Sequence, residues 1–183
     1  MICNCSKEDI AIINSQLGRA PEGIIEATKR CVYGFPQVIM VFPYIDGRGL
    51  FPTLYWLTCP HLRKSVANLE NNGFIAAFRD MIIENCDFRD KLISCDKLYR
   101  EERVKIVKHL DEDGRVSQKD LALLSEVGIG GCKDTLMVRC LHMHVAHYLA
   151  SGDNPIGEKC IDNLTTCEKG IYCDDLYCNK KLS

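Results

Sequence analysis

The chain has 183 residues, of which 46% are hydrophobic and 26% are charged. These proportions are typical of a soluble globular protein with a core of its own. The formal net charge of −2 gives no electrostatic attraction to nucleic acid or to an anionic membrane surface. No apolar run approaches the roughly 18 residues that a membrane-spanning helix needs. We therefore expect no nucleic-acid or membrane partner and leave a small-molecule or protein partner open.

Twelve cysteines are the most unusual feature of the composition. The N-terminus lacks the basic region and long apolar core of a secretory signal, which predicts a cytoplasmic protein. Thiols stay reduced in the cytoplasm, so disulfides are not the expected use of these residues. The sequence favours metal binding or reactive thiols instead.

The first predicted element is a helix over residues 7–17. Ser6 precedes it as an N-cap, and Glu8 and Asp9 place negative charge in its first turn, where the helix dipole favours it. Gly18 supplies the C-terminal stop.

Residues 24–58 have the composition of a small sheet. Short segments rich in Ile, Val, Phe, Tyr and Thr are separated by turn sequences at 34–36 and 46–49, which predicts antiparallel strands. The expected strands are 24–31, 37–44 and 52–58. Cys31 ends the first strand, and Cys59 follows the third.

After Cys59-Pro60 the periodicity becomes helical. The expected helices are 62–71, 74–85, 88 to about 110, 118–127, 139–150 and 156 to about 166. The predicted fold class is therefore α+β, with a small three-stranded antiparallel sheet near the N-terminus packed by a majority of helices. We expect one globular domain over residues 1–160 and a cysteine-rich C-terminal tail over 161–183. The tail region holds Cys160, Cys167, Cys173 and Cys178, whose spacing matches no metal motif.

Residues 109–120 resemble a calcium-binding loop when they are aligned on Gly114. Oxygen donors stand at the third, fifth and twelfth positions, but His109 occupies the first position and Asp120 the last. Both departures weaken a calcium site. The favoured interpretation is a polar connection in which Ser117 caps the next helix.

The segment 139–150 places one cysteine and three of the five histidines within eight residues of a predicted helix. At about 3.6 residues per turn, Cys140, His144 and His147 project from one face, and His142 points to the other side. The remaining residues are apolar, which predicts a buried helix. A metal ion, a carboxylate or an active site would satisfy the buried ring nitrogens, and an ordinary hydrogen-bonded core histidine is the alternative.

Cys31, Cys59 and Cys140 each fall where a sheet edge meets a helix, and a shared site is geometrically plausible. Three thiolates and one imidazole form a normal tetrahedral zinc shell. An iron–sulfur cluster remains the alternative cofactor, because Cys59 precedes a proline and the fourth position could stay open.

The fourth ligand of such a site is ambiguous. His144 lies one turn from Cys140 and is the better placed ligand. His147 lies two turns away, about 10.5 Å along the axis, and can instead serve as a ligand in a distorted helix or as a general base.

Several segments in order along the chain resemble the uncharacterised bacterial family called domain of unknown function 501, over about residues 15–160. The matching segments are 19–23 (RAPEG), 30–36 (RCVYGFP), 51–60 (FPTLYWLTCP), 139–142 (RCLH), 146–150 (AHYLA) and 154–157 (NPIG). The resemblance implies a shared fold and brings no established activity.

The family pattern also sorts the candidate residues. It carries cysteine at the positions of Cys31 and Cys140 and histidine at those of His142 and His147. Some members have histidine in place of Cys59, an exchange natural for zinc. The resemblance thus favours His147 over His144, against the helix geometry.

Three hypotheses follow from these residues. The protein is a metal-dependent enzyme in which His142 or His147 moves protons, or it holds a structural metal as a binding or scaffold protein. The third option is a metal-free enzyme whose nucleophile is Cys59, activated at a helix N-terminus.

Overall fold

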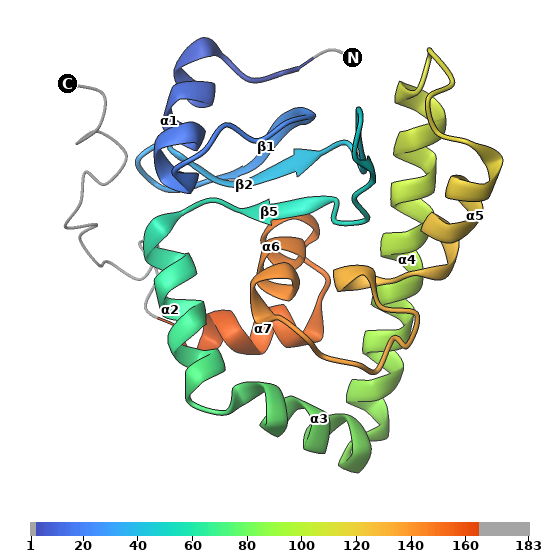
Figure 1. Cartoon of the computed structure of the whole chain (residues 1–183). Coiled ribbons are helices and arrows are strands. Elements are labelled where there is room, and N and C mark those ends of the chain that lie inside the picture. Colours follow the sequence, from blue (N-terminus) through green and yellow to red (C-terminus); the bar gives the residue numbers. More distant parts are fainter. Residues whose placement is uncertain (1–2, 165–183) are drawn as a thin grey trace.

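The structure is a computed structural model that describes residues 3–164. It confirms the α+β class, with a three-stranded antiparallel sheet near the N-terminus and helices around it (Figure 1). The α-helices of the described residues are α1 (Lys7–Leu17), α2 (Pro60–Asn71), α3 (Phe74–Glu84), α4 (Cys86–Leu110), α5 (Gln118–Glu126), α6 (Leu141–Ser151) and α7 (Pro155–Asp162). No helix within residues 3–164 combines the length and apolar character needed to cross a bilayer.

The sheet has the order β1-β2-β5, formed by β1 (Ile24–Arg30), β2 (Pro36–Val41) and β5 (Tyr55–Leu57). A separate short hairpin consists of β3 (Tyr44–Ile45) and β4 (Gly49–Leu50), and a 3-10 turn, η1, spans Ile129–Gly131. The hairpin interrupts the segment between β2 and β5, so the predicted strands 37–44 and 52–58 are shorter than expected.

Helix α1 begins and ends where the sequence predicts. Ser6 and Asp9 form a reciprocal capping box, and Gly18 ends the helix with a positive φ of 69°. The Asp9 carboxylate also accepts two hydrogen bonds from the Arg30 guanidinium of β1, at 2.6 and 2.9 Å. This pair joins α1 to the sheet, and the Arg30 guanidinium lowers the pKa of Asp9 to about 2.

Strand β2 is buried on both faces because different layers cover them. Ile39 and Val41 pack in a cluster with Ile13 of α1, whereas Val38 belongs to the main core with the other helices. Figure 1 shows α1 on one side of the sheet and α6 on the other. The alternation of strand side chains therefore places a small core above the sheet and the large core below it.

Helix α6 is the central element of the main core. It contacts all three strands of the sheet as well as α2, α7 and η1, and Figure 1 shows it between the sheet, α2 and α7. Leu141, Val145 and Ala146 have no exposed surface. The prediction that this helix is buried is confirmed.

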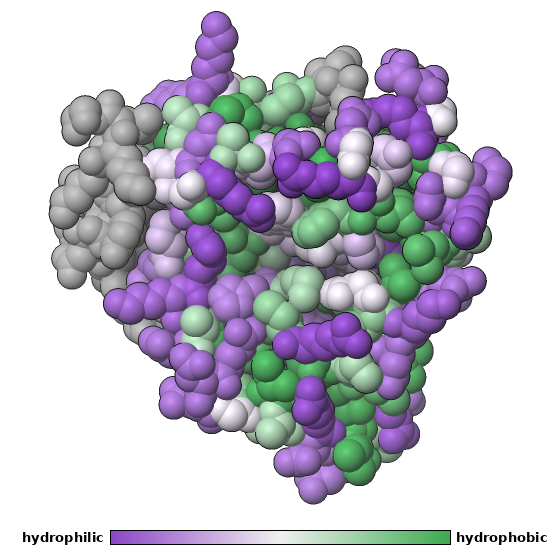
Figure 2. All heavy atoms as spheres, viewed as in Figure 1, coloured by the Kyte–Doolittle hydropathy of each residue, from purple (hydrophilic) through white to green (hydrophobic). Residues whose placement is uncertain are grey.

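The outer helices present a mixed surface. Figure 2 shows hydrophilic side chains over much of the viewed face, with apolar residues reaching the surface among them along α4. Ile93 and Leu98 of α4 are among the exposed large apolar residues of the protein. Scattered exposure of this kind is normal for a folded protein.

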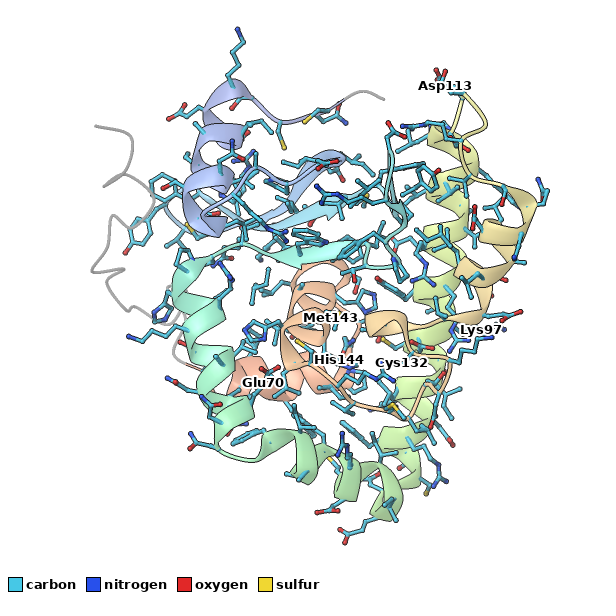
Figure 3. The ribbon with its side chains drawn as sticks, viewed as in Figure 1. Glu70, Lys97, Asp113, Cys132, Met143 and His144 are labelled. Carbon is cyan, nitrogen blue, oxygen red and sulfur yellow. The ribbon has the colours of Figure 1, made fainter. Side chains whose placement is uncertain are left out.

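The loop between α4 and α5 does not present its acidic residues as a calcium shell. The Asp111 carboxylate accepts hydrogen bonds from the amides of Arg115 and Val116, at 3.0 and 2.8 Å. Ser117 caps α5 by accepting from the Asp120 amide, as the sequence predicts. Figure 3 shows Asp113 at the tip of this loop, pointing outward.

The predicted cysteine-rich tail lies mostly outside the described residues. Cys160 is an exception, since it is fully buried on α7 and packs in the main core. Cys167, Cys173 and Cys178 fall beyond residue 164.

Candidate metal site

Three potential metal ligands meet where α6 begins beside α2. Glu70 comes from the last turn of α2, while Cys140 and His142 flank the first residue of α6. Their ligand atoms all lie within 4.8 Å of one another, and no other group of three or more His, Cys, Asp or Glu residues does so within residues 3–164. Figure 3 shows Glu70 on α2 and, from α6, Met143 and His144.

Cys140 takes part because it stands before the helix and not inside it. Its backbone is extended, with φ −151° and ψ 124°, and it occupies the N-cap position of α6. The Glu70 carboxylate accepts a hydrogen bond of 2.6 Å from the amide of Leu141. A carboxylate at this point is favoured by the unpaired amides and the dipole of the helix N-terminus.

The two ring nitrogens of His142 have different neighbours. Nε2 lies 3.0 Å from the carbonyl oxygen of Arg63, which can only accept, so Nε2 carries a proton. Nδ1 lies 3.2 Å from Oε1 of Glu70. In the neutral ring, Nδ1 therefore directs a lone pair at a carboxylate oxygen.

The Cys140 sulfur lies on the same side of the ring, 3.6 Å from Nδ1 of His142. Burial and the negative charge of Glu70 raise the pKa of the Cys140 thiol, while the amides of His142 and Met143 act in the opposite direction. Sulfur, nitrogen and oxygen thus converge on one point. Such an arrangement requires either a proton on Nδ1 or a cation among the three atoms.

The group is partly open to solvent. The side chains of Glu70 and His142 keep 23% and 26% of their exposure. An ion can therefore reach the site, and a further small ligand can approach it.

The structure differs from the predicted set of three cysteines with one histidine. Cys31 lies in the turn after β1, where its amide donates to the carbonyl of Phe35. Cys59 is the buried N-cap of α2 and packs in the main core. Neither belongs to the group around Cys140, because both occupy the end of the sheet from which α2 starts, and Glu70 stands at the other end of that helix.

His144 and His147, predicted as the fourth ligand, face a different partner. The side-chain nitrogen of Asn154 lies 3.2 Å from Nδ1 of each ring. The Asn154 oxygen accepts from the amide of Gly157 at 2.9 Å, which identifies the other end of the amide as the NH₂ group. That NH₂ group donates to both Nδ1 atoms, so both rings are neutral and carry their proton on Nε2.

Burial accounts for the neutral state of these two rings. It lowers the pKa of both His144 and His147 to about 4, and in His147 the neighbouring His144 acts in the same direction. The His147 ring stacks on Tyr55, with 5.8 Å between centroids, and meets the edge of Tyr99 at 5.0 Å. The Cys95 sulfur of α4 lies 3.6 Å from Nδ1 of His147 and donates to the carbonyl of Asp153.

Glu70 is the member of this group that the sequence did not reveal. A single glutamate in an amphipathic helix is usually a solvated side chain, and nothing in its neighbourhood distinguished it. Asn154 did carry a signal, because it lies in the segment 154–157 that resembles the family. The resemblance did not identify it as a partner for two histidines.

The fold and this site define a small α+β protein with a three-ligand candidate metal site at the start of its central helix. The chain belongs to the family described as "Protein of unknown function (DUF501)", which matches residues 27–162. The match confirms the resemblance found in the sequence and includes Glu70, Cys140 and His142. No curated protein and no solved structure matches the chain significantly.

Proposed function

We propose that this protein binds a zinc ion through Glu70, Cys140 and His142 and uses it as a metal-dependent enzyme. One observation carries the proposal. The Glu70 oxygen and the Cys140 sulfur both face Nδ1 of His142, while Nε2 is held by the carbonyl of Arg63. A histidine that binds a metal with one nitrogen usually donates from the other to a carbonyl or carboxylate.

The same geometry argues against a metal-free thiol nucleophile at Cys140. In a cysteine–histidine–acid relay, the thiol and the acid hold opposite nitrogens of the ring, so that the acid can orient the base. Here both compete for one nitrogen. Chelation explains this convergence, and a proton relay does not.

The donor set favours zinc. Zinc accepts thiolate, imidazole and carboxylate ligands together, whereas an iron–sulfur cluster is held chiefly by several thiolates. Three protein ligands with partial exposure are typical of catalytic zinc sites, which leave a fourth position for water or substrate. A structural zinc would require a fourth protein ligand.

Metal analysis of the full chain, purified without air, tests the proposal. We expect about one zinc per chain, and cobalt substitution should give sulfur-to-metal charge-transfer absorption that Cys140→Ser abolishes. Glu70→Gln, Cys140→Ser and His142→Ala should each weaken zinc binding by more than about 100-fold, since losses of outer-shell partners alone reach 10- to 100-fold.

Cys31→Ser is the matched control, because Cys31 was a predicted ligand but lies outside the Glu70–Cys140–His142 group. It should keep the zinc affinity of the wild type, with circular dichroism confirming that every variant is folded. Failure of the wild-type protein to bind zinc at micromolar concentration would overturn the proposal. Equal losses in Cys31→Ser and Cys140→Ser would instead restore the three-cysteine site.

A further inference from the structure

A second feature of α6, at its other end, has no part in the metal site. His147 is 4% exposed and lies against the rings of Tyr55 and Tyr99. Its Nδ1 accepts from Asn154, which leaves the proton on Nε2. Nε2 has no hydrogen-bond partner within residues 3–164. Nε2 is not among the fully buried side-chain atoms that lack a partner, so it keeps contact with solvent and can donate to a ligand.

His147 lines a cavity of about 950 Å³ between α4, β2 and the C-terminal end of α6. This volume is in the range of small-molecule sites, which are mostly apolar with a few well-placed polar groups. The aliphatic part of the wall is formed by Met40, Leu98, Ile106 and Leu110. Tyr99 and His147 add aromatic surface, so the cavity suits an apolar body that ends in a hydrogen-bond acceptor.

The charges around the cavity are predominantly negative. Three carboxylates line it, those of Glu101, Glu102 and Asp153, against the single ammonium of Lys105. Glu101 is partly neutralised by Lys97, 3.9 Å away. Glu102 accepts a hydrogen bond of 2.7 Å from the Tyr55 hydroxyl, which fixes its carboxylate and leaves the charge in place.

We propose that this cavity binds a small organic cation with an apolar body. Its hydrogen-bond acceptor takes the Nε2 proton of His147, and its ammonium group lies against the carboxylates of Glu102 and Asp153. Neither contact involves Glu70, Cys140 or His142. The cation site therefore stands or fails independently of zinc binding.

Two matched pairs of probes test the chemistry. Tyramine is compared with 4-hydroxyphenylacetate, and 4-(aminomethyl)benzamide with 4-carbamoylbenzoate. Each pair keeps the ring and the acceptor and exchanges the ammonium for a carboxylate. Binding is followed by NMR on the full chain, through the backbone amides and the Nε2 resonance of His147. We expect at least one amine to bind saturably and shift that resonance, and its matched acid to bind at least about 10-fold more weakly.

Two variants locate the site. His147→Phe keeps an aromatic ring against Tyr55 and Tyr99 but removes the Nε2 donor. Glu102→Gln keeps an acceptor for the Tyr55 hydroxyl but removes the charge. Each should weaken amine binding roughly 5- to 10-fold, the effect of one hydrogen bond or one partly exposed charge.

Three results would overturn the proposal. These are no saturable binding of either amine at millimolar concentration, equal binding of the amines and their acids, and undiminished amine binding in folded His147→Phe and Glu102→Gln. Zinc content, measured on the same samples, should be unchanged in both variants.

Discussion

Gly157 shows how one residue sets the distance between two helices. A Cβ atom at this position would lie 2.3 Å from the carbonyl oxygen of His144 and 2.5 Å from Cβ of Tyr148. Both atoms belong to the middle of α6, whose position is fixed by the surrounding core. The glycine of the segment 154–157 therefore allows α7 to touch the backbone of α6.

Gly157→Ala should reduce the free energy of unfolding by about 2–3 kcal/mol, the usual cost of forcing extra atoms into a packed core. Urea unfolding at neutral pH measures the change. Glu158→Ala, at an exposed position of the same helix, is the control and should stay within about 0.5 kcal/mol of the wild type. A free energy of unfolding equal to that of the wild type would contradict this prediction, because it would mean that α7 can move away from α6 without loss of stability.

Cys140 shows why the structure groups the candidate ligands differently from the sequence. Helical spacing placed Cys140 on one face with His144 and His147, and that expectation assumed that the helix includes residue 140. The backbone is extended there, so the cysteine leaves that face and meets His142 instead. The helix begins at Leu141, two residues later than predicted, and sequence patterns do not resolve helix boundaries to that precision. This shift groups Cys140 with Glu70 and His142 and separates it from His144 and His147.

At the scale of the elements, local signals were sufficient for most of the fold. The caps Ser6 and Ser117 and the stop at Gly18 lie where the sequence places them, because capping depends on neighbours within a few residues. The site depends on longer contacts. The Glu70 carboxylate accepts a hydrogen bond from the amide of Leu141, 71 positions later in the chain. No local sequence pattern predicts such a contact.

The junction of α6 and α7 depends on the two ends of the Asn154 side chain. Asn154→Asp keeps the oxygen that caps α7 but replaces the NH₂ group with an oxygen that faces two lone pairs. At pH 8 we expect this variant to be less stable than the wild type by about 3 kcal/mol, because the buried carboxylate keeps only the Gly157 amide as a donor and its second oxygen faces the lone pairs of two ring nitrogens.

The pH dependence of Asn154→Asp should be opposite to that of the wild type. The new carboxylate raises the pKa of the adjacent imidazole of His147 in the folded state above its unfolded value. The pair of this carboxylate and the protonated His147 ring then contributes its full stabilisation below the unfolded pKa of the histidine. That contribution is lost as the pH rises through the folded pKa of the histidine. Urea unfolding at pH 8, 7 and 6 should show recovery on acidification, and Asn154→Ala, which loses cap and donors together, should show none. A steady loss of stability in Asn154→Asp as the pH falls would refute the assigned orientation of the amide.

At the scale of the whole molecule, buried polar groups join the separate layers. The fully buried Arg103 of α4 donates to the carbonyl groups of Pro52, Leu124 and Val127. It thus joins the loop before β5 to the end of α5. His147 joins α6 to the sheet through Tyr55 and to α4 through Tyr99 and Cys95. Disturbing such a residue should therefore affect global unfolding and not only one helix.

Lowering the pH tests whether protonation of His147 destabilises the whole fold. Burial lowers its pKa from 6.5 to about 4, His144 adds to the shift, and Asp96 opposes it. Between these two pH values the unfolded chain binds more protons than the folded one, so stability is complete above about 6.5 and falls as the pH falls towards 4. Each histidine whose pKa is lowered by burial in this way should reduce the free energy of unfolding by about 1.4 kcal/mol per pH unit between these two pKa values.

His147→Phe isolates that contribution, because phenylalanine keeps a ring against Tyr55 and Tyr99 but does not titrate. Urea unfolding between pH 8 and pH 5 should give a clearly shallower loss of stability in this variant than in the wild type. The salt bridge of Asp9 does not interfere in this range, because the ordinary pKa of 3.8 and the lowered pKa of about 2 of that carboxyl both lie below pH 5. Equal slopes in the two proteins would mean that His147 takes up its proton without unfolding the core, and that its ring is reached by water in the folded state.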